Sequence, residues 1–121
     1  MILMIDNYDS FVFNVEQYLK ELSCEEVKTV RNDEISIEEI RKLNPSKIVL
    51  SPGPKHPKDS GFCLEILKEI EDIPILGICL GHQAIGYTFG SQIKRMENPM
   101  HGKSSEIEVL YDNSKLFRDL P

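Results

Sequence analysis

The sequence predicts an α/β fold with a doubly wound, mainly parallel sheet and helices on both faces. Apolar and often β-branched runs recur at residues 2–5, 27–30, 47–50 and 73–78, and such runs are typical of buried strands. Stretches of helical periodicity separate them. Strands that alternate with helices along a chain form βαβ units and hence a parallel sheet. The length of 121 residues fits one domain, so we expect a single domain over residues 1–121.

The first predicted helix follows the first strand. Its apolar residues are spaced by three or four positions, as on one face of an amphipathic helix. They are Phe11, Val15, Tyr18, Leu19 and Leu22. Just before them, Asp9 or Ser10 is expected to cap the helix, because short polar side chains accept hydrogen bonds from free backbone N–H groups.

Two more helices are predicted before the last strand. One begins at Ser36, which forms a capping box with Glu39, and stops before Pro45. The other carries apolar residues at positions i, i+3, i+4 and i+7. These are Cys63, Ile66, Leu67 and Ile70.

Beyond Gly90 the pattern changes. Polar and apolar residues alternate over 92–95 and 106–110. Such alternation is typical of half-exposed antiparallel strands, so we expect an antiparallel C-terminal extension of the sheet.

Composition excludes several classes of function. The net charge of −6 disfavours a nucleic-acid backbone as partner. No apolar run approaches the roughly 20 residues of a membrane-spanning helix. The N-terminus lacks the basic start of a signal peptide, which indicates a cytoplasmic protein. The three cysteines form no C-x-x-C pair, so free thiols are expected and no metal site.

The segment Gly77-Ile78-Cys79-Leu80-Gly81 has the form of a nucleophile elbow. It joins a buried-strand pattern to a helix-like segment at 82–89. A nucleophile on such a turn has a strained backbone, and small residues two positions away let strand and helix approach closely. The positive end of the helix favours the thiolate of Cys79. The N–H of Leu80 would point to the same space and could stabilise an oxyanion.

The alternative is that Cys79 is a small core residue at the end of a strand. Two glycines in register with it favour the nucleophile. Cys24 and Cys63 lack this setting and are expected to fill surface and core.

A second loop, Ser51-Pro52-Gly53-Pro54, follows the third strand, at the end where α/β sheets bind ligands. Its prolines could hold a backbone N–H toward a substrate, although an ordinary turn explains the pattern equally well. His56, His82 and His101 are candidate bases for Cys79. Direct reach from His82 is not expected, because a helical side chain leans along its own face.

At these residues the sequence resembles the class I (triad) glutamine amidotransferases, and within them the amidotransferase subunits of anthranilate and para-aminobenzoate (aminodeoxychorismate) synthases. Four motifs in order carry the resemblance. They are Asp6-Asn7-Tyr8-Asp9-Ser10-Phe11, Ser51-Pro52-Gly53-Pro54, Gly77-Ile78-Cys79-Leu80-Gly81-His82-Gln83 and Met100-His101-Gly102-Lys103. The first and last are typical of the chorismate branch.

The resemblance implies that Cys79 attacks the side-chain amide of glutamine and forms a γ-glutamyl thioester. It further implies that the N–H groups of Gly53 and Leu80 form the oxyanion hole and that Gln83 helps to hold glutamine. Ammonia would pass to a chorismate-using synthase subunit within a hetero-oligomer. No metal or cofactor is implied.

The sequence departs from the family pattern in two places. Lys55 replaces a glycine that usually follows Pro-Gly-Pro, and no His-x-Glu, the family's general base and its orienting carboxylate, occurs in the chain. We therefore expect an incomplete, apparently truncated domain with little activity alone. A non-catalytic module that docks on the synthase and an unrelated thiol hydrolase remain alternatives. The anthranilate and para-aminobenzoate branches are not separated.

Overall fold

The computed structural model describes residues 1–94, 97, 104–110 and 114–118. Its strands and helices alternate along the chain, as the fold prediction requires. In order they are β1 (Ile2–Asp6), α1 (Val12–Leu22), β2 (Val27–Arg31), α2 (Ile37–Leu43), β3 (Lys47–Leu50), the 3₁₀-helix η1 (Pro57–Asp59), α3 (Phe62–Glu69), β4 (Ile75–Gly77) and α4 (Leu80–Thr88).

The four strands form one parallel sheet in the order β2-β1-β3-β4. Ile5 of β1 lies opposite Val30 on one side and Leu50 on the other. The chain first moves outward from β1 to β2 and then crosses back to β3, so the winding direction changes between β1 and β3. In open α/β sheets this switch point, at the carboxyl ends of the strands, is where ligands bind.

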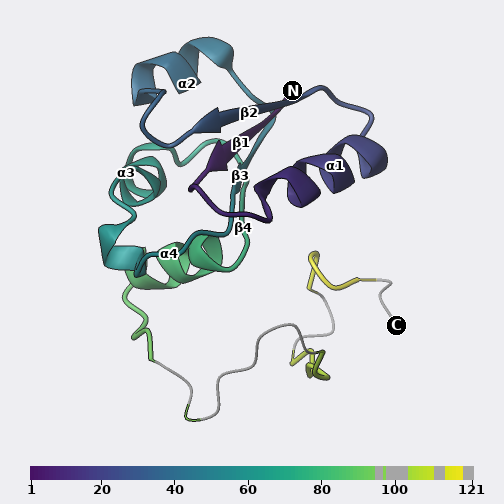
Figure 1. Ribbon diagram of the computed structural model, residues 1–121, viewed down its shortest axis with the longest axis vertical. Helices are drawn as coiled ribbons and strands as arrows, with labels where there is room; N and C mark the ends of the chain where they lie inside the picture. Colours follow the sequence, from purple (N-terminus) through teal and green to yellow (C-terminus); the bar gives the residue numbers. More distant parts are fainter. Residues whose placement is uncertain (95–96, 98–103, 111–113, 119–121) are drawn as a thin grey trace.

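Helices cover both faces of the sheet, which confirms the prediction (Figure 1). Helix α1 packs on one face, where its Val12 joins the buried side chains of Ile2, Met4 and Val49. Helices α2, α3 and α4 pack on the other face. The buried residues of these helices pack against buried residues of the sheet. The helices contribute Ile40, Cys63, Ile66, Leu67 and Ala84, and the sheet contributes Leu3, Ile5, Ile48 and Leu50.

The local signals for α2 are confirmed. Ser36 is its N-cap, and the Ser36 hydroxyl oxygen accepts a hydrogen bond from the N–H of Glu39 at 3.2 Å. The helix ends at Leu43, before Asn44, whose φ of 47° lies in the left-handed region. The predicted apolar positions of α3 are also buried.

Helix α1 corrects the predicted apolar stripe. Its buried face consists of Val12, with Val15 and Leu19 packed beside it. Tyr18 and Leu22 are 63% and 86% exposed, because they lie on the flank and in the last turn of the helix, away from the sheet. Phe11 is likewise half exposed.

Asp9 and Ser10, the two residues predicted to cap α1, lie before the helix and not at its N-cap position. Phe11 is the N-cap residue and makes no side-chain cap bond. Instead, a carboxylate oxygen of Asp9 accepts the N–H of Phe11 at 2.9 Å. The turn before the helix is therefore stabilised by Asp9, and the helix itself begins at Val12.

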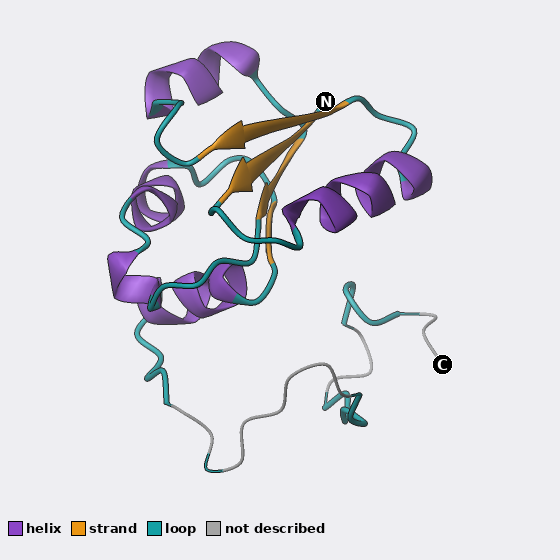
Figure 2. Cartoon of the chain, in the orientation of Figure 1, coloured by secondary structure: helices purple, strands orange, loops and turns teal. Residues whose placement is uncertain are grey.

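The expected antiparallel strands are absent from the described residues of their segments, 92–94 and 106–110, which form no regular structure (Figure 2). Arg95 lies outside the described residues. An alternating pattern forms a strand only when a neighbouring strand pairs with it, and none does so here among the described residues. The exposed Ile107 and Leu110 agree with this unpaired state.

No helix in the described part of the chain has the length and apolar character to cross a bilayer.

Candidate active site

Cys79 occupies the turn between β4 and α4, as the elbow pattern predicts. It is exposed, and its φ of 54° and ψ of −107° are strained for a residue with a side chain. The N–H of Gly81 donates to the carbonyl oxygen of Ile78 at 3.0 Å and closes the turn. Cys79 is thus presented at the N-terminus of α4, where the helix dipole favours negative charge.

Two glycines allow the close approach of strand and helix at this turn. A β-carbon on Gly77 would lie 2.5 Å from the carbonyl group of Gly81. A β-carbon on Gly81 would lie 2.3 Å from the carbonyl oxygen of Leu50. Any side chain at either position would collide with backbone, so the elbow depends on both glycines.

The loop after β3 lies against the elbow. A β-carbon on Gly53 would lie 2.4 Å from Leu80 Cδ2, so the side chain of Leu80 packs directly on the Gly53 backbone. Among the described residues, the N–H groups of Gly53 and Leu80 find no acceptor. Backbone N–H groups without an acceptor are the kind of donor from which oxyanion holes are built.

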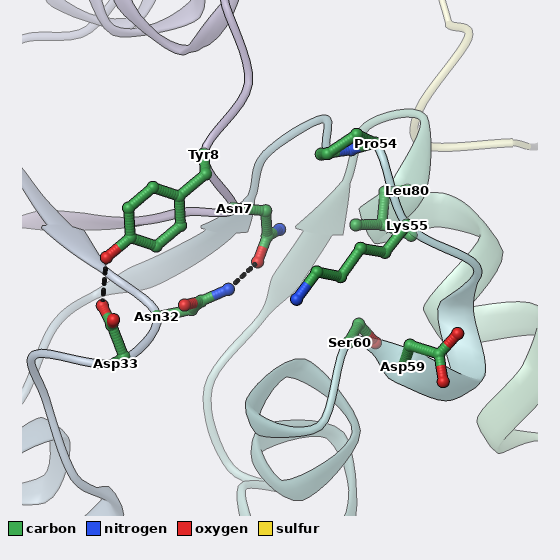
Figure 3. A pocket seen from close by; sticks show the side chains of 9 residues that line it. All are labelled: Asn7, Tyr8, Asn32, Asp33, Pro54, Lys55, Asp59, Ser60 and Leu80. Atoms are coloured by element: carbon green, nitrogen blue, oxygen red, sulfur yellow. Dashed lines mark hydrogen bonds between the residues drawn. The ribbon is translucent and has the colours of Figure 1, made fainter.

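Lys55 is compatible with this loop. The described non-glycine residues with positive φ are Tyr8, Asn44 and Cys79, so the backbone at Lys55 does not require glycine. The exposed side chain of Lys55 extends along a cavity beside the loop (Figure 3).

That cavity, of about 190 Å³, opens at the carboxyl ends of β1, β2 and β3. Its walls include Asn7, Asn32, Lys55 and Leu80. Tyr8 lines it as well; its hydroxyl donates to Asp33 at 2.6 Å, and this hydrogen bond raises the pKa of Tyr8. Of the predicted site residues, Leu80 lines this cavity.

Gln83 lies one helical turn after the elbow. It is half-buried, and its N–H donates to the carbonyl oxygen of Cys79 at 2.9 Å. The structure thus brings Gly53 and Leu80 into contact next to Cys79 and places Gln83 on the helix that leaves the elbow.

Of the three histidines that are candidate bases for Cys79, the structure describes two, His56 and His82. Nδ1 of His56 accepts the N–H of Lys58 at 3.2 Å and caps η1. Its ring also meets Tyr87 edge-on, with ring centroids 6.3 Å apart. His82 is exposed on α4. His101 lies outside the described residues.

The other two cysteines differ from Cys79. Cys24 is exposed and Cys63 is buried, as expected. Burial raises the pKa of the Cys63 thiol, and this thiol donates to Asn7 Oδ1 at 3.2 Å.

The sequence assigned no separate role to Asn7, which belongs to the first family motif, or to Asn32. Asn7 directly follows β1 and is only 4% exposed, and its Oδ1 accepts a hydrogen bond from Asn32 Nδ2 at 3.1 Å. The signals for Asn7 were that motif and a short amide side chain at the carboxyl end of the first strand, where α/β sheets hold functional groups.

The fold and this elbow define the class of protein. The chain belongs to the class I glutamine amidotransferase family, whose model, described as glutamine amidotransferase class-I, matches residues 3–121. The crystal structure of a Thermoplasma acidophilum protein described as one of the subunits of GMP synthase superimposes with a TM-score of 0.78 at 29% identity, covering 99% of this chain and 59% of that one.

Curated relatives are more similar in sequence to this chain than that crystal structure is. The anthranilate synthase component 2 of Pyropia yezoensis is 52% identical over 100% of this chain and 63% of its own length. The aminodeoxychorismate/anthranilate synthase component 2 of Bacillus subtilis is 50% identical over 99% of this chain and 61% of its own length. The chain therefore spans about three fifths of the length of these curated relatives.

Proposed function

We propose that this protein is the glutamine amidotransferase subunit of a chorismate-using synthase, with Cys79 as its nucleophile. One observation carries the proposal: an exposed cysteine lies on a strained strand-to-helix turn, and the next residue, Leu80, packs on Gly53. The N–H groups of Leu80 and Gly53 have no acceptor among the described residues. The arrangement suits attack on a carbonyl group, because a negative oxygen then forms beside fixed donors.

The reaction divides into two steps. The thiolate of Cys79 attacks the side-chain amide carbon of glutamine, a C–S bond forms, and the carbonyl electron pair moves to the oxygen. The N–H groups of Gly53 and Leu80 stabilise this oxyanion. When the carbonyl group re-forms, the C–N bond breaks, the nitrogen takes up the proton that the Cys79 thiol released on forming the thiolate, and ammonia leaves. Water then cleaves the γ-glutamyl thioester, which releases glutamate and restores the thiol.

The remaining roles follow from the family pattern. Gln83 helps to hold glutamine, from its position one turn along α4. The family's general base comes from a His-x-Glu pair, which does not occur in the 121 residues, so none of these residues is assigned as the base. No cofactor takes part in the two steps.

The partner is a component 1 subunit that uses chorismate and receives the ammonia. The relatives named component 2 of anthranilate or aminodeoxychorismate synthase support this. We place the complex in the cytoplasm, where free cysteines stay reduced.

The test is glutamine hydrolysis by the protein together with its chorismate-using partner. Because the chain has no His-x-Glu pair, we expect slow ammonia release. Cys79→Ser should abolish it, while the variant still binds the partner. A complex that forms but releases no ammonia from glutamine would contradict the proposal and favour a non-catalytic docking module.

A further inference from the structure

Two buried polar residues join the strands at the switch point. Asn7 follows β1, and Ser51 follows β3; they are 4% and 0% exposed. The N–H of Asn7 donates to Ser51 Oγ at 2.9 Å, and Asn7 Nδ2 donates to the carbonyl oxygen of Ser51, also at 2.9 Å. These bonds hold together the chain segments that directly follow β1 and β3.

The side chain of Asn7 is fixed in one orientation. Its Oδ1 accepts from Asn32 Nδ2 at 3.1 Å and from the thiol of Cys63 at 3.2 Å, while its Nδ2 donates to Ser51. A flipped amide would place donor against donor and acceptor against acceptor. Asn7 therefore has three side-chain hydrogen bonds to three different parts of the fold (Figure 3 shows the bond to Asn32).

The same residue forms the back of the Gly53 loop. A β-carbon on Gly53 would lie 2.9 Å from Asn7 Cβ and 3.1 Å from the carbonyl oxygen of Asn7. The same β-carbon would lie 2.4 Å from Leu80 Cδ2. The α-carbon of Gly53 therefore packs against both Asn7 and Leu80, two residues after the carbonyl group that Asn7 binds.

We propose that Asn7 is a positioning residue for the oxyanion hole: its side-chain amide holds the Ser51–Gly53 segment so that the Gly53 N–H faces the same space as the Leu80 N–H. This inference rests on the proposed function. A donor aligned before the reaction stabilises the oxyanion without reorganisation, and loss of one donor in such a hole costs about 100- to 1000-fold in rate. Misalignment of the Gly53 donor should cost a smaller factor.

The test compares two reagents at Cys79 in the full chain. A diazomethyl ketone analogue of glutamine, with a diazomethyl group in place of the amide nitrogen, puts its ketone oxygen where the amide oxygen binds. Iodoacetamide loses iodide from a saturated carbon, so no oxyanion forms. The ratio of the two labelling rate constants therefore reports on the oxyanion hole separately from thiol reactivity and from overall folding.

Three variants make the comparison specific. Asn7→Ser removes the donor to the Ser51 carbonyl oxygen, and Asn32→Ala frees Asn7 Oδ1 from one partner. Ser60→Ala is the control, because it removes another buried hydrogen bond, from the Ser60 hydroxyl to the Pro57 carbonyl oxygen. Circular dichroism and thermal melting select the variants that fold.

We expect the ratio to fall by about tenfold or more in Asn7→Ser, to fall less in Asn32→Ala, and to stay at the wild-type value in Ser60→Ala. An unchanged ratio in folded Asn7→Ser overturns the inference. If that variant does not fold, an unchanged ratio in Asn32→Ala does so. A wild-type chain whose Cys79 does not react with the ketone refutes the proposed function instead, and the inference falls with it.

Discussion

The carbonyl oxygen of Leu50, the last residue of β3, lies 2.3 Å from the place that a β-carbon on Gly81 would occupy in the first turn of α4. Because a backbone atom cannot move aside as a flexible side chain can, Gly81→Ala must displace the helix or the strand. We expect it to destabilise the fold by about 3 kcal/mol or more and to disturb the elbow. Urea unfolding measures the change.

Gly86→Ala is the matched control in the same helix. A β-carbon there would meet Ser91 Cβ at 3.5 Å, an ordinary contact. Since alanine favours the helix over glycine, we expect Gly86→Ala to be neutral or to stabilise by about 0.5–1 kcal/mol. Equal losses of stability in both variants would show that the close approach of Gly81 to Leu50 does not cause the destabilisation.

The strained backbone at position 79 predicts that a residue with a side chain lowers the stability of the fold there. At a φ of 54° glycine has no steric penalty. Cys79→Gly should therefore be more stable than Cys79→Ala, by about 1 kcal/mol, although both lack the thiol. Thermal melts of the two variants under one set of conditions give the difference. If Cys79→Ala equals or exceeds Cys79→Gly in stability, the turn is not strained.

Glu25 makes the fold sensitive to acid. Its carboxylate accepts hydrogen bonds from Lys47 Nζ, from the Ser46 hydroxyl and from the N-terminal amine, and these bonds, that of Lys47 first, lower its pKa to about 2. A carboxyl group with a lowered pKa in the folded state stabilises above its ordinary pKa of 4.5. This contribution is lost as the pH falls through about 2.

We therefore expect Glu25→Gln to melt at a lower temperature than wild type at pH near 7, and the difference to shrink as the pH falls from about 4.5 toward 2. Glu26→Gln is the neighbouring control, since Glu26 has no ion pair among the described residues. A constant difference across this pH range would rule out the Glu25 carboxylate as its source.

The capping box of α2 gives a separate stability prediction. Ser36→Ala removes the acceptor of the Glu39 N–H and should cost about 1 kcal/mol. Ser36→Asp keeps an acceptor at the N-cap and should stay close to wild type. If alanine and aspartate behave alike in chemical denaturation, the cap does not contribute.

The features that the sequence predicted correctly are local ones. A run such as 47–50 marks a strand wherever it lies in the fold, and Ser36 with Glu39 marks a helix start within four residues. The elbow belongs to this group as well, because Gly77, Cys79 and Gly81 are neighbours along the chain. Their spacing alone indicated a tight turn, and the structure has that turn.

The features that were missed depend on contacts between distant segments. Tyr18 and Leu22 have the spacing of a buried stripe, but the position of α1 on the sheet leaves them exposed. The alternating segment 106–110 needs a partner strand to pair with. Asn7 is connected to Ser51 and Cys63, which lie 44 and 56 positions further along the chain, and no local pattern reveals such contacts.

The most direct test of the central claim is to map which cysteine reacts with the diazomethyl ketone analogue of glutamine. Cys24 and Cys63 are internal controls, one exposed and one buried. We expect peptide mass spectrometry to find the label on Cys79, and we expect excess glutamine to protect this residue. Labelling of the exposed Cys24 to the same extent, or labelling of Cys79 that glutamine does not slow, would contradict the assignment of Cys79 as a glutamine-directed nucleophile.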